Sequence, residues 1–201
     1  MSDFLVKSFV PLTYDFYLRS TRIVAQEILG KFIVRSLKNK FLIGKIVEVE
    51  AYEGSNDPGS HAYGNVTARN YIMYGPPGFS YVYFIYGIHY CLNIVTEKIG
   101  IPGAILVRAL EPIHGSDIMK QNRNTSRLTN LTNGPAKLTQ ALNITSNHNN
   151  LNLTCDDELY ICRSINKENF NIANDFRIGV KKENNKPWRY FIESNPFVSV
   201  V

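Results

Sequence analysis

The stretch from residue 80 to residue 95 constrains the fold more than any other part of the chain. It reads Ser-Tyr-Val-Tyr-Phe-Ile-Tyr-Gly-Ile-His-Tyr-Cys-Leu-Asn-Ile-Val and contains a single turn signal, Tyr86-Gly87. Alternating aromatic and aliphatic residues around such a signal are typical of a β-hairpin. We therefore predict strands over 80–85 and 88–95, with Tyr86 at or near the tip. A large aromatic at a hairpin tip cannot pack against its own sheet, so ordinary strand packing does not explain Tyr86.

A second alternating stretch, residues 46–52, places two carboxylates on one rigid element. Successive side chains of a β-strand point to opposite faces, so the pattern predicts a buried face made of Val47, Val49 and Ala51. Glu48 and Glu50 are expected on the opposite, solvated face. A glutamate in that position is most often a surface residue, and this interpretation of Glu50 stands beside a catalytic one.

The neighbours of Glu50 favour a chemical role. Tyr52 follows on the same strand face, and His61 lies in a loop able to fold back over it. A carboxylate beside aromatic rings can act as a general base on water if a cation keeps it ionised. Arg108 is the candidate cation, because an arginine inside an apolar strand needs a partner. Taken singly, His61 and the strand tyrosines also fit structural roles.

Other segments predict short helices and strands that adjoin one another. Helical spacing and capping residues predict helices over 21–29, 117–123 and 135–142. Apolar alternation predicts strands over 32–35, 41–51, 104–110 and 188–192, with a returning edge over 195–201. Residues 53–77, rich in Gly, Pro, Asn and Ser, predict a long loop with only short ordered pieces, of a length that is usually either functional or disordered. Because strands outnumber helices and follow one another, we predict an antiparallel α+β fold.

Size and composition narrow the class of protein. A chain of 201 residues that is 44% hydrophobic supports one full core, so we expect a single domain over 1–201. The net charge of +5 mildly favours a polyanionic partner. Residues 1–9 lack the features of a secretory signal, and no apolar run approaches the roughly 20 residues of a membrane span. We expect no membrane partner and a location that is cytoplasmic and nucleoid-associated, or otherwise intracellular, with reduced thiols at Cys91, Cys155 and Cys162.

Metal and phosphate-loop chemistry are not indicated. The possible metal ligands form no closely spaced His/Cys cluster, so we expect no metal and no cofactor; they are Glu48, Glu50, Asp57, His61 and His89. The chain also contains neither a Gly-rich phosphate loop after a strand nor a Gly-X-Ser-X-Gly elbow.

Several segments together resemble the alkyladenine (3-methyladenine) DNA glycosylase family of base-excision repair. They are Glu50-Ala-Tyr52, His61, Tyr81-Val-Tyr83 followed by Tyr86-Gly87, Asn93, Leu106-Val-Arg108-Ala-Leu-Glu-Pro, Asn133-Gly-Pro-Ala-Lys-Leu and Asn195-Pro-Phe-Val-Ser-Val. The last two are similar to the family's Gly-Pro-Ser-Lys-Leu and Ser-Pro-Trp-Val-Ser-Val motifs. The matches cover most of the chain in the right order. The resemblance implies a curved antiparallel sheet with a protruding hairpin and several surrounding helices.

This resemblance also implies a reaction and a partner. Glu50 corresponds to the general base that, with Arg108, holds the attacking water. The implied enzyme is monofunctional: it flips an alkylated or deaminated purine out of double-stranded DNA and hydrolyses its N-glycosidic bond, leaving an abasic site. A monomer without cofactor is expected. The preferred lesion stays open among 3-methyladenine, 7-methylguanine, hypoxanthine and ethenoadenine.

The base pocket is implied residue by residue. Tyr52, His61 and Tyr83 correspond to walls that stack on the extruded base. Asn93 corresponds to the asparagine that disfavours guanine by opposing its exocyclic amine, and Leu106 to a residue close to the flipped nucleotide. Tyr86 matches the tyrosine that fills the gap left in the duplex.

Two departures and two alternatives accompany the resemblance. His89 stands where relatives have tyrosine, and the loop 55–60 has its own sequence, which bears on substrate range. One alternative is a different hydrolase in which Glu48 and Glu50 pair like glycosidase carboxylates, although such chemistry needs them across a sugar. The other is a non-catalytic DNA-damage binding protein with the same aromatic pocket.

Overall fold

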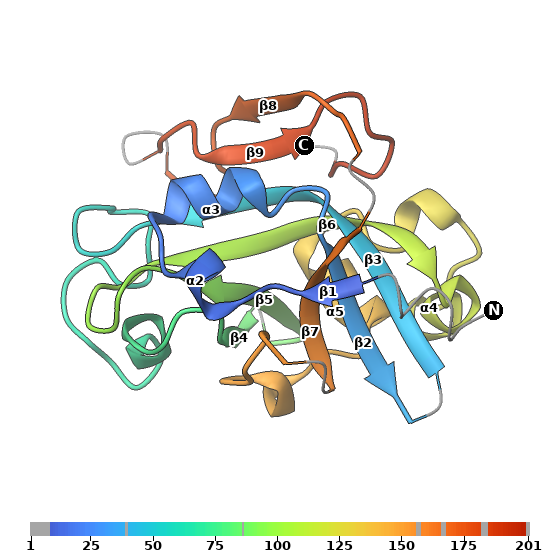
Figure 1. Ribbon diagram of the computed structural model, residues 1–201, viewed down its shortest axis with the longest axis horizontal. Coiled ribbons are helices and arrows are strands. Elements are labelled where there is room, and N and C mark those ends of the chain that lie inside the picture. The colour runs from blue at the N-terminus through green and yellow to red at the C-terminus, as the bar shows by residue number, and fades with distance from the viewer. Residues whose placement is uncertain are drawn as a thin grey trace.

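The computed structural model describes residues 9–38, 40–85, 87–155, 158–165, 168–181 and 185–199. Its centre is one antiparallel sheet in the order β1-β7-β2-β3-β6-β5-β4, with β9 paired to β3 and β8 paired to β9 (Figure 1). The strands are β1 (Phe9–Pro11), β2 (Phe32–Leu37), β3 (Lys40–Tyr52), β4 (Ser80–Ile85), β5 (His89–Val95), β6 (Ala104–His114), β7 (Leu159–Ser164), β8 (Ile172–Asp175) and β9 (Arg189–Ile192). The predicted antiparallel α+β class is confirmed.

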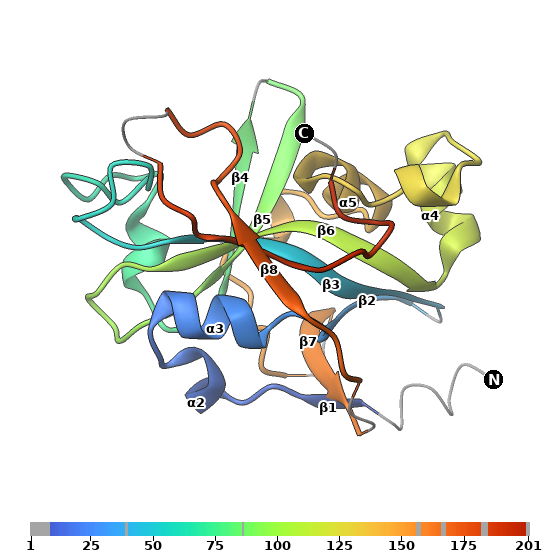
Figure 2. The same cartoon turned by 90° about the horizontal axis from the view of Figure 1, so that it is seen from above.

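Helices cover both faces of the sheet. The α-helices are α2 (Tyr14–Tyr17), α3 (Thr21–Glu27), α4 (Ser116–Arg123) and α5 (Pro135–Ala141), and the 3-10 helices are η1 (Tyr71–Tyr74), η2 (Leu128–Asn130) and η3 (Ser146–His148). Figure 2 shows α2 and α3 on one side of β3 and β6, with α4 and α5 on the other. None of the helices in the described ranges combines the length and apolar character that a bilayer crossing requires.

The long strand β3 is buried on both faces, so the predicted solvated face is wrong. One edge of β3 pairs with β6 along most of its length, and the other pairs first with β2 and then with β9. Val47 and Val49 enter the hydrophobic core, yet Glu48 and Glu50 are also 0% exposed. Segments from the C-terminal part of the chain, including Ser199, cover the carboxylates. No local pattern within β3 could reveal that cover.

The predicted aromatic hairpin is confirmed. β4 and β5 pair antiparallel with Ile85 opposite His89, and β5 begins one residue later than expected. The hairpin projects beyond the rest of the sheet in Figure 2. Phe84 and Ile88 near its end are 50% and 72% exposed. Tyr86 lies outside the described residues.

Helix boundaries agree with the sequence to within a few residues, although the start of α3 is stabilised differently. Ser20 occupies the N-cap position without a side-chain bond. Instead, the Thr21 backbone N–H donates to Glu97 Oε1 at 2.6 Å. The helix is thereby tied to the turn after β5, and Gly30, with φ +76°, leads the chain into β2. The predicted β2–β3 hairpin is present with longer strands.

Two of the predicted strands need correction, and several elements were not predicted. The strand expected to stop at Leu110 continues to His114, and Pro112 pairs with Gly44 beside a register shift, where a missing N–H is tolerated. The segment 195–199 forms turns and no strand. The strands β1, β7 and β8 and the helix α2 were not predicted.

Candidate active site

Glu50 lies at the centre of a buried hydrogen-bond network. Its Oε2 accepts a bond from the Tyr52 hydroxyl at 2.7 Å. Its Oε1 accepts a bond from the Ile178 backbone N–H at 2.7 Å and lies 3.2 Å from Arg108 Nη1. The structure thus brings together Glu50, Tyr52 and Arg108, the residues that the strand patterns selected. Sequence analysis did not identify the Ile178 donor, because it comes from a loop 128 positions away.

The surroundings of Glu50 tune its basicity. Burial raises the pKa of the Glu50 carboxyl above its ordinary value, because the charged form loses hydration. The Arg108 guanidinium, the Ile178 N–H and the Tyr52 hydroxyl each lower this pKa in part, since they stabilise the carboxylate. Burial, together with Glu50, raises the pKa of Tyr52, so its hydroxyl stays protonated and keeps donating. A raised pKa with donors in place suits a general base at moderate pH.

Glu48 has a different environment. Its Oε1 lies 3.1 Å from Arg108 Nε and 2.7 Å from Arg189 Nε. The Ser199 backbone N–H and hydroxyl donate to the same carboxylate at 2.6 and 2.7 Å. A fully buried carboxylate that already accepts four bonds serves to hold Arg108 in place. This geometry counts against the alternative in which Glu48 and Glu50 flank a sugar as a glycosidase pair.

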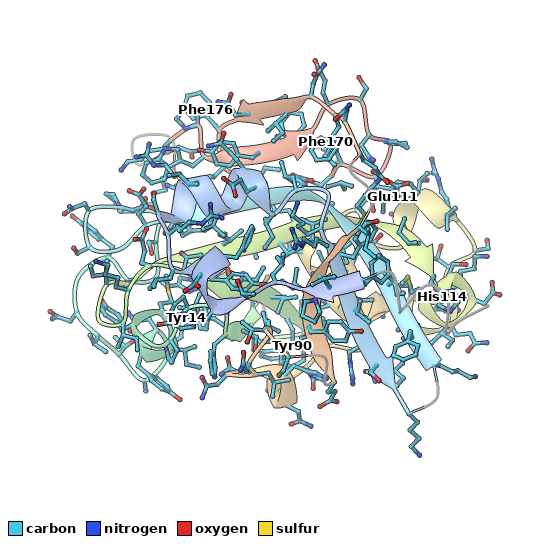
Figure 3. All side chains as sticks on the ribbon, in the orientation of Figure 1. Tyr14, Tyr90, Glu111, His114, Phe170 and Phe176 are labelled. Carbon is cyan, nitrogen blue, oxygen red and sulfur yellow. The ribbon has the colours of Figure 1, made fainter. Side chains whose placement is uncertain are left out.

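A second buried ion pair holds the loop that reaches Glu50. Phe176, labelled in Figure 3, lies on the outside of the molecule after β8, whereas the following Arg177 is buried. Arg177 donates to both oxygens of Asp57 at 2.6 and 2.8 Å, and its Cζ lies 4.7 Å from the centroid of the Tyr52 ring. Sequence analysis considered Asp57 only as a possible metal ligand and missed Arg177. The pair presents Ile178 to Glu50.

An aromatic cavity of about 370 Å³ lies beside this network. Its walls include Tyr52, His61, Tyr83, Asn93, Leu106, Arg108 and Ile178. The five predicted pocket residues and Arg108 therefore meet at one cavity. Glu50 is not on the wall, but its three hydrogen-bond or ion-pair partners are, so its carboxylate lies directly behind the lining. This volume lies within the range of small-molecule binding sites.

The loop residue His61 joins the strand tyrosines of β4. Its Nδ1 lies 2.9 Å from the Tyr81 hydroxyl, and its ring centroid lies 4.6 Å from that of Tyr83. Burial and the charge of Arg69 lower the pKa of His61 to about 4, so the imidazole is neutral near pH 7. Asn93 Nδ2 donates to the Tyr81 carbonyl at 3.1 Å, which orients this side chain in the wall. The cavity thus presents neutral aromatic faces.

Arg69, which sequence analysis did not select, lies over one of these rings. Its Cζ is 5.2 Å from the Tyr83 centroid, a cation–π distance. The residue is exposed and follows the loop that carries His61. Nothing in the sequence distinguished it from other loop arginines.

Helix α5 closes the cavity on the side where β5 begins, near the hairpin turn. Pro135 and Ala136 at its start belong to the cavity wall, as does His89 of β5. Lys137 Nζ donates to the side-chain oxygens of Asn130 and Asn133 at 2.8 and 2.9 Å, which fixes the turn before the helix. Within the described ranges, no three His, Cys, Asp or Glu residues come together in a way that could hold a metal ion.

Known proteins resemble this chain along most of its length. Residues 15–196 match the family model described as methylpurine-DNA glycosylase. A protein of Francisella tularensis subsp. tularensis (strain WY96-3418) is 50% identical over 177 residues, which cover 87% of this chain and 91% of the relative. Proteins of Carboxydothermus hydrogenoformans and Clostridium acetobutylicum are 45% identical over 188 residues and 44% over 202, each covering 94% of this chain and 98% of the relative. All three carry the provisional name 3-methyladenine DNA glycosylase.

Proposed function

This chain belongs to the methylpurine-DNA glycosylase family, and on that premise we propose that it hydrolyses the N-glycosidic bond of damaged purines in duplex DNA and leaves an abasic site. The named relatives support a DNA glycosylase role. The observation that carries the finer proposal is the position of Glu50, held by Tyr52, Arg108 and the Ile178 N–H directly behind an aromatic cavity.

In the proposed reaction, Glu50 is the general base and Arg108 orients the water. The water oxygen attacks C1′ of the deoxyribose and transfers a proton to Glu50, while the C1′–N bond breaks and its electron pair leaves on the purine nitrogen. General base assistance typically contributes about 10²–10⁴-fold to the rate. Neither Tyr52 nor Ile178 needs to move for this step, because both already donate to the carboxylate.

Base flipping gives the aromatic cavity its role. A base within a duplex is inaccessible, so the enzyme extrudes it at a cost of a few kcal/mol. Stacking on an aromatic side chain is worth about 1–3 kcal/mol per base, so Tyr52, His61 and Tyr83 can offset much of that cost. Tyr86 fills the vacated position in the duplex, and Asn93 disfavours guanine.

The proposal is tested by base release from duplexes that contain one hypoxanthine or one 7-methylguanine. The unmodified chain should release the base. Glu50→Gln should bind the same duplex but release the base at least about 100-fold more slowly. Glu53→Gln is the matched control, since Glu53 pairs with Arg22 at the surface. Near-normal release by Glu50→Gln would remove Glu50 from the role.

The same assay separates the other candidates. Tight binding without release by the unmodified chain would assign a DNA-damage binding protein. A covalent protein–DNA adduct trapped with borohydride would contradict monofunctional hydrolysis, because it requires an amine nucleophile.

A further inference from the structure

The cations around the base cavity differ in how they are neutralised. Arg108 faces Glu48 and Glu50, and Arg189 also faces Glu48. Arg177 is paired with Asp57. Arg69 makes no ion pair with any carboxylate in the part of the chain that the structure describes. Among Arg69, Arg108, Arg177 and Arg189, it is therefore the arginine whose charge is not cancelled by a neighbouring anion in those ranges.

Arg69 acts on the cavity through its aromatic wall. Its guanidinium lies over the Tyr83 ring, and Tyr83 belongs to the lining while Arg69 does not. The charge reaches further, because it contributes to the lowered pKa of His61, after burial. It also opposes the effect of burial on the pKa of Tyr81. Three of the ring systems at or beside the cavity thus lie within the field of one cation.

Such a field distinguishes two chemical classes of damaged purine. Alkylation of a ring nitrogen, as in 7-methylguanine, makes the base of the intact nucleotide a cation, whereas hypoxanthine is neutral. A cation already on the Tyr83 ring face reduces the attraction of that ring for a second one, and adds direct repulsion. A neutral base meets neither effect. The two bases also differ in the exocyclic amine that faces Asn93, but that difference is the same in every Arg69 variant. A change in preference when Arg69 alone is altered therefore reports the effect of its charge.

We propose that Arg69 is a specificity-determining residue that biases the base cavity toward neutral damaged purines and against cationic ones. The inference rests on the proposed glycosylase function and names a substrate preference within it. For unit charges about 10 Å apart at a partly solvated site, Coulomb's law corresponds to a bias on the order of threefold to tenfold.

The test is a competition between two duplexes of the same sequence, one carrying 7-methylguanine and one carrying hypoxanthine, each opposite cytosine. The ratio of the two initial release rates gives the ratio of kcat/KM values. Arg69→Gln should raise the 7-methylguanine to hypoxanthine ratio about threefold to tenfold. Arg69→Lys keeps the charge and should leave the ratio near that of the unmodified chain. Because Arg69 is exposed, neither variant removes a core contact.

Other outcomes overturn the inference. Equal losses on both duplexes in Arg69→Gln would make Arg69 a phosphate contact, which lowers affinity without regard to the lesion. An unchanged ratio with normal rates would leave Arg69 without a role in selection, while the proposed function would stand. Release of neither base by the unmodified chain would defeat the proposed function itself, and the inference with it.

Discussion

The Ile178 backbone N–H donates to Oε1 of Glu50 at 2.7 Å across 128 positions of sequence. This bond depends on the neighbouring Arg177, whose buried ion pair with Asp57 fixes the loop on which Ile178 lies. Arg177 also donates to the Ala51 carbonyl at 3.1 Å, beside Glu50 itself. The loop after β8 and the loop after β3 are therefore joined at the point where the proposed base receives its donor.

Removing Asp57 should destabilise the protein and loosen the Glu50 site together. In Asp57→Ala the Arg177 guanidinium stays buried without its carboxylate, a change that typically costs about 3–5 kcal/mol in the free energy of unfolding. Urea unfolding measures the loss. Glu53→Ala is the control, because its surface pair with Arg22 is worth about 1 kcal/mol or less. Equal stability of the two variants would contradict the structural role of the Asp57–Arg177 pair.

Base release should fall in acid as Glu50 is protonated. A general base works only in its charged form, so activity is present above its pKa and lost as the pH falls through it. Because burial raises the pKa of Glu50, the acid limb of the kcat/KM profile should lie above the ordinary value of 4.5. His61, with a pKa of about 4, is neutral from pH 5 to pH 8 and should add no inflection there. An acid limb at or below pH 4.5 would contradict the prediction.

Neutralising Glu48 should move that acid limb to lower pH. The charge of Glu48 contributes to raising the pKa of Glu50, and its loss also leaves Arg108 to interact with Glu50 alone. Both effects favour the charged form of Glu50, so Glu48→Gln should stay active to lower pH. Glu111→Gln, which alters a pair with Lys45, should leave the limb in place. A shift of the acid limb to higher pH in Glu48→Gln would contradict the claim that the charge of Glu48 raises the pKa of Glu50.

Tyr86 is expected to act on the duplex and not on the chemistry. Tyr86→Ala should weaken binding to damaged duplex while leaving base release from a single strand nearly unchanged, because a single strand has no gap to fill. Phe84→Ala removes another exposed aromatic of the same hairpin and should not discriminate between the two substrates. Equal losses on duplex and single strand in Tyr86→Ala would make Tyr86 a packing residue.

The sequence predicted those parts of the fold that follow from the regular spacing of apolar residues within one segment. The β4–β5 hairpin and the placement of Tyr52 beside Glu50 follow from alternation at a spacing of two. The burial of Glu50 does not, since it depends on Ile178 and on the segment around Ser199. The strand β7 was missed because its first four residues are all buried, which removes the alternation that marks a strand.

The site contacts that sequence analysis did not identify share one cause. Asp57 and Arg177 are 120 positions apart and both lie in irregular loops, where no period connects them. The same holds for Arg69. Its contact with Tyr83 depends on how a loop that contains glycine and asparagine folds, and no spacing in the sequence connects the two residues. The resemblance to known motifs selected residues of the pocket wall, whereas Asp57, Arg177 and Arg69 lie outside those motifs.

The bonds from Ile178 and Ser199 to β3 have a consequence for synthesis of the protein. A nascent chain that has emerged only as far as β7 already contains Glu50, Arg108 and the tyrosines of the hairpin. It lacks Ile178, Arg189 and Ser199, which donate hydrogen bonds to the two carboxylates of β3. Glu48 and Glu50 would therefore still be hydrated, and Arg108 would be only partly held in place. The hydrogen-bond network around Glu50 is therefore complete only once Ser199 has emerged, after the β4–β5 hairpin has been made.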